Sequence, residues 1–172
     1  MKNKFFVLAL PRSRTYWLSK FLSTESCEVE HDGSMNYRSI EEMIDNMPDG
    51  NCDTALALHW EKLQGKVVVI DRDLEECIMS CKKLNIEIDE IFMSKIALSL
   101  KAASEVHPVV PYNDLSYENT CKWIFEYLTG EVFDRDHWLK FNETKIEVLP
   151  FRHIEKMYQK RENIMAMYGE FL

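Results

Sequence analysis

Residues 5–22 read FFVLALPRSRTYWLSKFL, an apolar run that passes through a cationic turn into an amphipathic segment. The apolar run is typical of a buried strand, and the helical spacing that follows predicts a helix from about Thr15. A strand that leads directly into a helix leaves backbone N–H groups and the positive end of the helix dipole at one place. Two arginines and two hydroxyls in this turn predict a phosphate or sulfate site. An ordinary turn with surface arginines is the alternative.

The composition predicts one globular domain over residues 1–172. Hydrophobic residues make up 46% of the chain and charged residues 29%, as in globular domains of this size. The net charge of −8 argues against binding to nucleic acid or to acidic membranes. No run is long enough to span a bilayer, and the first apolar run is too short for a signal peptide. Five cysteines without paired metal-ligand spacing predict a reducing, cytoplasmic setting, buried thiols and no metal.

Strand and helix patterns alternate along the chain. We expect strands at Lys4–Leu10, Glu28–His31, Thr54–His59, Lys66–Asp71 and Pro108–Tyr112. We expect helices at Thr15–Ser23, Ser39–Asn46, Leu74–Leu84, Asp89–Glu105, Ser116–Thr129 and about Ile154–Tyr168. Residues 47–51 have turn composition, and residues 131–150 are the least regular part. This alternation predicts an α/β fold of three layers, α/β/α, around a central, mostly parallel five-stranded sheet.

Polar residues follow every predicted strand. Ligand sites of open α/β sheets lie at the carboxyl ends of the strands, so these residues should lie along one edge. They are PRSRT at 11–15, HDGS at 31–34, HW at 59–60, DRD at 71–73 and YNDL at 112–115. The first loop lacks the glycines and the lysine of a Walker A motif, which argues against an ATP- or GTP-hydrolysing enzyme.

Three of these segments resemble the sulfotransferases that use 3′-phosphoadenosine 5′-phosphosulfate (PAPS). Pro11-Arg12-Ser13-x-Thr15-x-Trp17-Leu18 resembles their 5′-phosphosulfate-binding loop. VVVIDRDL at 67–74, followed by Ser80, is similar to their strand–Arg-Asp/Asn-Pro–helix segment. More weakly, YNDL at 112–115 before FEYL at 125–128 resembles their Tyr-Glu-Asp-Leu segment. The matches follow the family's order over residues 4–130 and imply a P-loop NTPase-like sulfotransferase fold.

The resemblance implies roles at the sulfonate end of the donor. Arg12 stands where the family has its catalytic lysine or arginine, and would neutralise charge on the bridging and sulfonate oxygens. Ser13, Thr15 and Tyr16 would hold the 5′-phosphate. Arg14 replaces the usual glycine, so it must adopt a helical N-terminal conformation or turn its side chain away, or else add a second cation.

At the other end of the donor, the resemblance assigns the 3′-phosphate to Arg72 and Ser80. It places Trp17 on one side of the adenine and Tyr112 on the other. The family's basic C-terminal loop over the 3′-phosphate has no clear counterpart. Candidate replacements are Arg152, Lys156, Lys160 and Arg161, although the pattern favours a solvated helix face for them.

Two histidines are candidates for the general base that takes the proton of the acceptor. His59 closes a predicted strand, which is comparable to the position of the catalytic histidine in cytosolic members of the family. His31, followed by Asp32, closes the neighbouring predicted strand and is the rival.

Three other functions remain open on the sequence. A non-catalytic module could bind a nucleotide or anion and lack transfer. A small-molecule kinase with a divergent P-loop is a further alternative. A pure interaction protein would use aromatic side chains such as Trp123 and Trp138.

Overall fold

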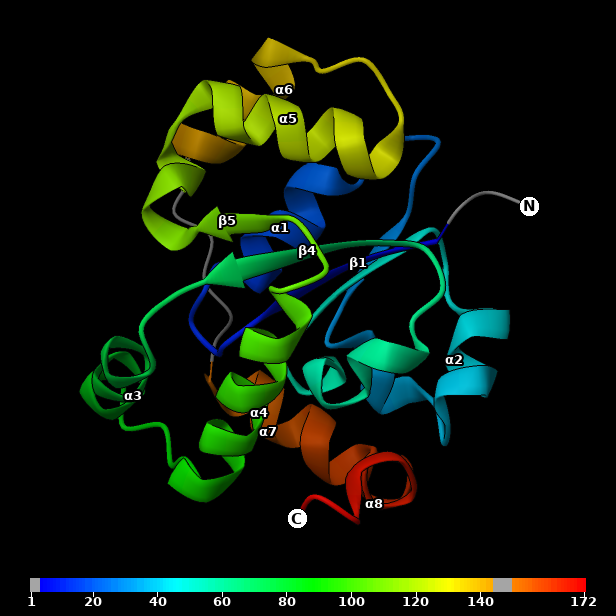
Figure 1. Ribbon diagram of the computed structural model, residues 1–172, viewed down its shortest axis with the longest axis vertical. Helices are drawn as coiled ribbons and strands as arrows, with labels where there is room; N and C mark the ends of the chain where they lie inside the picture. Colours follow the sequence, from blue (N-terminus) through cyan, green and yellow to red (C-terminus); the bar gives the residue numbers. More distant parts are fainter. Residues whose placement is uncertain (1–3, 144–149) are drawn as a thin grey trace.

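The computed structural model describes residues 4–143 and 150–172. Five strands form one sheet in the order β2-β3-β1-β4-β5, and every neighbouring pair is parallel (Figure 1). The strands are β1 (Phe5–Ala9), β2 (Val29–His31), β3 (Gly50–Asp53), β4 (Lys66–Asp71) and β5 (Val109–Pro111). The predicted α/β class with a five-stranded sheet is confirmed, and the sheet is entirely parallel.

Helices cover both faces of the sheet (Figure 1). One face carries α1 (Thr15–Leu22), α5 (Glu118–Thr129) and α6 (Arg135–Glu143). The other carries α2 (Ile40–Asn46), α3 (Leu74–Lys83), α4 (Glu90–Ala103) and α8 (Arg161–Tyr168), which follows α7 (Pro150–Gln159). Alternate side chains of β1 enter the two cores, as the period of two in a strand requires.

Local capping explains where several helices begin. The side chains of Ser39, Asp73 and Asp89 accept N–H hydrogen bonds at the starts of α2, α3 and α4. These helices, with α1 and α5, begin and end within about two residues of the predicted bounds. All five cysteines are buried and none forms a disulfide; burial was predicted for Cys77 and Cys81.

The predicted strand over Thr54–His59 is wrong. A 3₁₀ helix, η2, occupies Ala55–Lys62 instead, and the strand β3 lies at Gly50–Asp53, partly inside the predicted turn. The buried Asp53 side chain accepts the Leu56 N–H at 3.0 Å and so starts the 3₁₀ turn. The strand itself carries polar side chains that are satisfied internally, which is why an apolar pattern did not reveal it.

The chain after residue 130 also differs from the prediction. Arg135–Glu143, expected to be irregular, forms α6, whose Trp138 is buried in the core around α1. Residues 144–149 of the irregular stretch lie outside the described residues. The single C-terminal helix predicted over about Ile154–Tyr168 is two helices, α7 and α8, which meet at Lys160.

The connections that follow β1 and β4 diverge at the carboxyl ends of these neighbouring strands. The chain leaves β1 toward α1 on one face and leaves β4 toward α3 on the opposite face. Adjacent parallel strands whose connections diverge in this way open a ligand crevice between them. The loops that border it contain Arg12 and Arg72.

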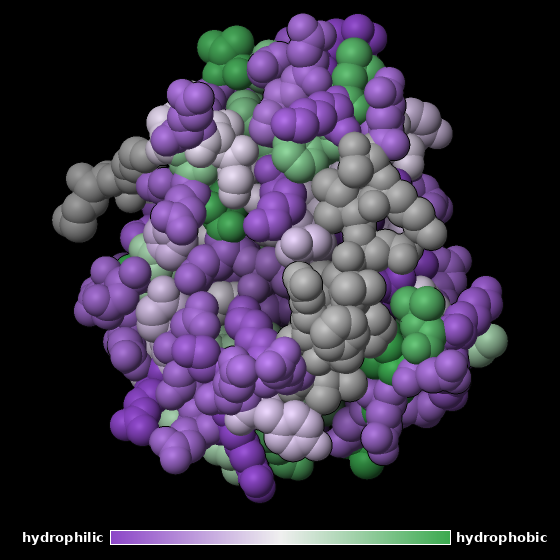
Figure 2. Space-filling view, turned by 180° about the vertical axis from the view of Figure 1, so that it is seen from behind, coloured by the Kyte–Doolittle hydropathy of each residue, from purple (hydrophilic) through white to green (hydrophobic). Residues whose placement is uncertain are grey.

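The surface is mainly hydrophilic on the side opposite to that of Figure 1, where apolar side chains form separate small groups (Figure 2). Among the residues that the structure describes, no helix combines the length and apolar character needed to cross a membrane.

Candidate functional site

The loop between β1 and α1 has an unusual backbone. Arg12 has φ 67° and Arg14 has φ 63°, in the left-handed region that non-glycine residues rarely adopt. Left-handed residues in a tight turn can direct backbone N–H groups toward one side, a geometry that binds anions. Arg14 is the N-cap of α1 and provides no side-chain cap, unlike the aspartates before α3 and α4. The first N–H groups of α1 therefore lack the partner that a capping side chain supplies.

Arg14 adopts a left-handed backbone conformation, which glycine adopts most readily. Its Nη1 donates to the Leu115 carbonyl oxygen at 3.2 Å, and its guanidinium carbon lies 5.5 Å from the centroid of the Trp17 ring. Of the alternatives that the sequence left open for Arg14, the helical conformation is not adopted: the backbone is left-handed, and the side chain is held toward the turn after β5.

Four predicted ligands of the donor meet at the crevice. Arg12 Nε lies 3.5 Å from Ser80 Oγ, which joins the first loop to α3. Arg72 donates from Nη1 to the Arg12 carbonyl oxygen, and its guanidinium carbon lies 3.9 Å from the centroid of the Tyr112 ring. These residues follow three different strands.

The Arg72 guanidinium retains a hydrogen-bond donor that a ligand could use. Its side chain is 13% exposed, and Nε lies 3.7 Å from a Glu76 carboxylate oxygen. Within the described residues, that buried Nε has no hydrogen-bond partner. Arg72 and Ser80 also line an open groove of about 540 Å³ on α3, together with Lys83. A buried guanidinium donor beside an open groove suits a phosphate ligand.

Ser13 and Trp17 of the predicted loop are buried and held by contacts within the protein. The Ser13 hydroxyl lies 3.9 Å from Cys77 Sγ. Trp17 is 6% exposed, donates from Nε1 to the Phe141 carbonyl oxygen at 2.9 Å and stacks on Phe21. Trp17 therefore stiffens α1 against α6, and Tyr112 is the aromatic ring that faces Arg72.

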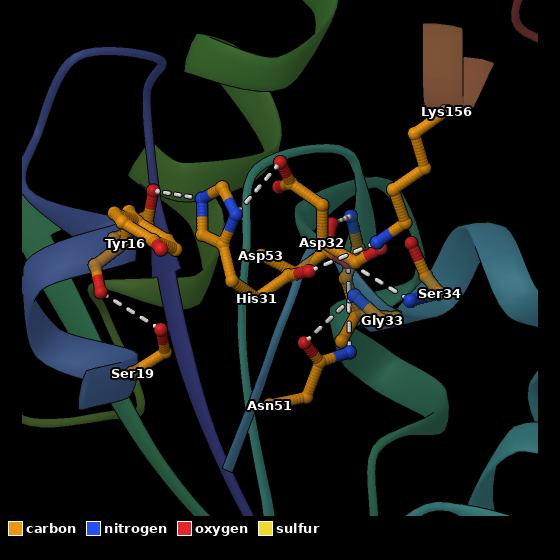
Figure 3. Close-up of polar contacts among 11 residues, drawn as sticks. Tyr16, Ser19, His31, Asp32, Gly33, Ser34, Asn51, Asp53 and Lys156 are labelled. Carbon is orange, nitrogen blue, oxygen red and sulfur yellow. Dashed lines mark hydrogen bonds and ion pairs between the residues drawn. The ribbon is translucent and has the colours of Figure 1, made fainter. Parts of the chain in front are cut away.

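A second polar group lies where β2 ends, beside the start of α1 (Figure 3). His31 Nε2 is 3.1 Å from the Thr15 hydroxyl, and His31 Nδ1 is 3.3 Å from the Asp32 carboxylate. The Tyr16 ring meets the imidazole edge to face, with centroids 5.2 Å apart. The first loop and the end of β2 are thereby connected through hydrogen bonds.

The sequence did not reveal the buried scaffold under His31. Asn51 Oδ1 accepts the Gly33 N–H at 3.1 Å, and the Asp53 carboxylate accepts the Ser34 N–H at 3.1 Å (Figure 3). Burial, and secondly the charge of Asp32, raise the pKa of Asp53. The alternation of Asn51 and Asp53 is a strand signal, but the turn residues before it masked that signal.

Lys156 of α7 approaches the end of β2. Its ammonium group donates to the carbonyl oxygens of His31 and Asp32 at 3.1 and 3.0 Å. Of the cations considered for the 3′-phosphate, Lys156 is thus engaged elsewhere, Lys160 and Arg161 lie where α7 meets α8, and the Arg152 side chain lies outside the described part.

His59 does not join these residues. It lies in η2 rather than at a strand end, and its ring packs against Tyr168 and Phe171. Its Nε2 donates to the Met167 carbonyl oxygen at 2.9 Å, which holds the C-terminal segment against the sheet.

We expect His59→Gln to lower stability and to flatten its dependence on pH. Burial is the main cause that lowers the pKa of His59 in the folded protein, whereas the unfolded chain has the ordinary value of about 6.5. The stability that the neutral ring provides is therefore present above about pH 6.5 and lost as the pH falls through the folded-state pKa. Lost ring packing should cost about 1–3 kcal/mol at pH 7. Urea unfolding from pH 5 to 8 tests this, and parallel curves for both proteins would contradict it.

The residues thus form a cationic crevice at the switch point of a parallel sheet, with a histidine–aspartate pair beside it. Comparisons with protein-family models, curated proteins and solved structures found no match. Residues 4–143 and 150–172 contain no group of three or more His, Cys, Asp or Glu side chains that could hold a metal ion.

Proposed function

We propose that this protein is a sulfotransferase that moves a sulfonate group from PAPS to a hydroxyl or amine. The observation that carries the proposal is the convergence of Arg12, Arg72, Ser80 and Tyr112 at the switch point. Three of them follow different strands, namely β1, β4 and β5, and Ser80 lies in α3. Each has a role that the resemblance to the sulfotransferase family implies.

The donor substrate fits the chemistry of the crevice. Arg72, whose buried Nε lacks a hydrogen-bond partner among the described residues, and Ser80 would bind the 3′-phosphate, the group that distinguishes this donor from ATP. The uncapped start of α1 would receive the 5′-phosphate. Tyr112 would contact the adenine.

Sulfonate transfer needs positioning and charge neutralisation more than covalent help from the protein. The bond between sulfur and the bridging phosphate oxygen breaks, and a bond from sulfur to the acceptor oxygen or nitrogen forms. The leaving 3′,5′-ADP keeps the electron pair, and Arg12 neutralises the charge that develops on these oxygens. A base receives the proton that the acceptor loses.

His31 is the better supported base. It contacts Thr15 of the first loop, whereas the Nε2 proton of His59 is engaged by the Met167 carbonyl on the other side of the sheet. A base must lie within hydrogen-bond reach of the reacting group, directly or through one bridging group.

Calorimetric titration with 3′,5′-ADP, 5′-ADP and ATP tests the donor site. We expect clear preference for 3′,5′-ADP, because only this ligand carries the group that Arg72 and Ser80 would bind. Equal affinity for all three nucleotides, or no binding, would contradict the proposal. Preferential binding of ATP with magnesium would favour a divergent P-loop small-molecule kinase.

A non-catalytic nucleotide- or anion-binding module is the second candidate. The observation in its favour is Arg14, whose side chain is held by the Leu115 carbonyl where the family has glycine. Tight binding of 3′,5′-ADP, combined with no sulfonate transfer from PAPS to any member of a panel of phenols, alcohols and amines, would identify this function.

A further inference from the structure

We propose that Thr15, His31 and Asp32 form a hydrogen-bonded relay. In this relay Asp32 holds the proton of the neutral imidazole on Nδ1, and the Thr15 hydroxyl covers Nε2 until a bound donor draws the hydroxyl away. His31 Nε2 is then the atom that takes the acceptor's proton. The reaction served by the relay rests on the proposed function, whereas the hydrogen bonds are a property of the free protein.

The chemistry of the three groups fixes the direction of the hydrogen bonds. An ionised carboxylate only accepts, so the contact of 3.3 Å between Asp32 and His31 Nδ1 requires the proton on Nδ1. In a neutral ring the other nitrogen is then an acceptor. The contact of 3.1 Å at Nε2 is therefore a hydrogen bond donated by the Thr15 hydroxyl.

The backbone keeps the pair in this arrangement. The Asp32 N–H donates to the Cys52 carbonyl at 3.0 Å, while Lys156 binds the carbonyl oxygens of both His31 and Asp32. The side chains of His31 and Asp32 are only 17% and 12% exposed. Asp32 itself has φ 48°, a left-handed conformation that directs its side chain back toward the ring (Figure 3).

Among the described residues, charged and titratable groups near the imidazole come from the end of β2 and from β3, α7 and α1. Asp32 touches the ring, and Asp53 of β3 lies behind it and interacts with Asp32. Lys156 of α7 places a positive charge on the backbone side, and Tyr16 of α1 presents its ring. The Asp32 carboxylate contacts Nδ1 of the ring at 3.3 Å and so favours the tautomer with the proton on that nitrogen.

Thr15 links the relay to the anion-binding loop. It is the first residue of α1, and its hydroxyl carries one proton, which it can donate either to His31 or to a phosphate oxygen. A phosphate at the start of α1 would take this hydrogen bond, because hydrogen bonds to charged acceptors are the stronger ones. Nε2 would then be released to the acceptor only when the donor is bound.

Nitrogen-15 NMR of the His31 ring, in free protein at about pH 8.5, tests the relay. The ring is neutral once its nitrogen-15 signals stop changing with rising pH, and the spectrum then reports the tautomer. We expect the wild type to carry the proton on Nδ1. In Asp32→Asn the amide can donate to Nδ1, so we expect the population with the proton on Nε2 to rise. Asparagine tolerates the left-handed conformation, so this variant keeps the turn.

Two further comparisons sharpen the test. Glu28→Gln removes a carboxylate at the start of the same strand, away from the ring, and should leave the tautomer as in the wild type. Thr15→Val removes the hydroxyl at nearly constant volume. It should move the Nε2 signal of the free protein to the value that the wild type shows when saturated with 3′,5′-ADP.

In turnover, Asp32→Asn should lower kcat about 10²- to 10⁴-fold, the range of general base catalysis, with little change in the affinity for 3′,5′-ADP. An unchanged tautomer in Asp32→Asn would overturn the relay. If 3′,5′-ADP does not bind, the proposed donor site fails, and the tautomers of the free wild type and of Asp32→Asn still decide whether the relay exists.

Discussion

Replacing Arg72 with alanine is expected to weaken binding of 3′,5′-ADP about 10²- to 10⁴-fold and to abolish the preference for 3′,5′-ADP over 5′-ADP. Two hydrogen bonds from a guanidinium to a phosphate contribute about 1.5–3 kcal/mol each, and about 1.4 kcal/mol corresponds to a tenfold change in Kd. The variant also loses the hydrogen bond to the Arg12 carbonyl, so the first loop is held less firmly. Calorimetric titration of both nucleotides measures the effect.

Two variants separate the role of the guanidinium from that of charge. Arg72→Lys keeps the charge but loses the planar fork, so it should recover only part of the affinity. Arg38→Ala removes an exposed arginine that pairs with Glu162 and should bind like the wild type. If Arg72→Ala retains the preference for 3′,5′-ADP, then Arg72 is not the ligand of the 3′-phosphate.

Replacing Arg12 with glycine is expected to lower kcat for sulfonate transfer about 10²- to 10³-fold, with a smaller change in the affinity for 3′,5′-ADP. This is the usual effect of removing one group that stabilises charge in a transition state. Glycine is preferred to alanine here because Arg12 has φ 67°, which glycine adopts without strain. Steady-state turnover with labelled PAPS provides the measurement.

Arg12→Lys is the matched control because it restores the charge at the same backbone position. It should recover most of the rate, since a lysine ammonium also neutralises charge on the transferred oxygens. Equal loss of kcat in the glycine and lysine variants would show that the guanidinium acts through its contact with Ser80 and not through its charge.

The fold was largely predictable because most elements carry a clear pattern. The apolar runs that became β1 and β4, and the side-chain caps Ser39, Asp73 and Asp89, define their elements from local sequence alone. β3 was missed because it buries Asn51 and Asp53, whose partners are distant in the sequence. The apolar residues after β3 face the core from the 3₁₀ helix η2. Over such a short segment, their spacing resembles that of a strand.

The positions of those site residues that directly follow a strand could be predicted from the sequence. Arg12, Arg72 and Tyr112 follow parallel strands, and the sheet order brings these ends together. Side-chain direction could not be read in the same way. The Trp17 side chain points into the core, and the His59 side chain points toward the C-terminal segment. Each donates a hydrogen bond to a residue more than 100 positions away in the chain, so local sequence does not determine its direction.

The two left-handed arginines give the first loop a thermodynamic character of its own. Each such conformation costs an L-residue about 1–2 kcal/mol, a strain that the folded protein already carries without ligand. Because the loop is held in this shape by contacts of Arg12 with Ser80 and of Arg14 with Leu115, an anion meets a preorganised cradle and need not order it. Binding should therefore approach lock-and-key behaviour, with a smaller entropic penalty than a glycine-rich loop of the same length would incur.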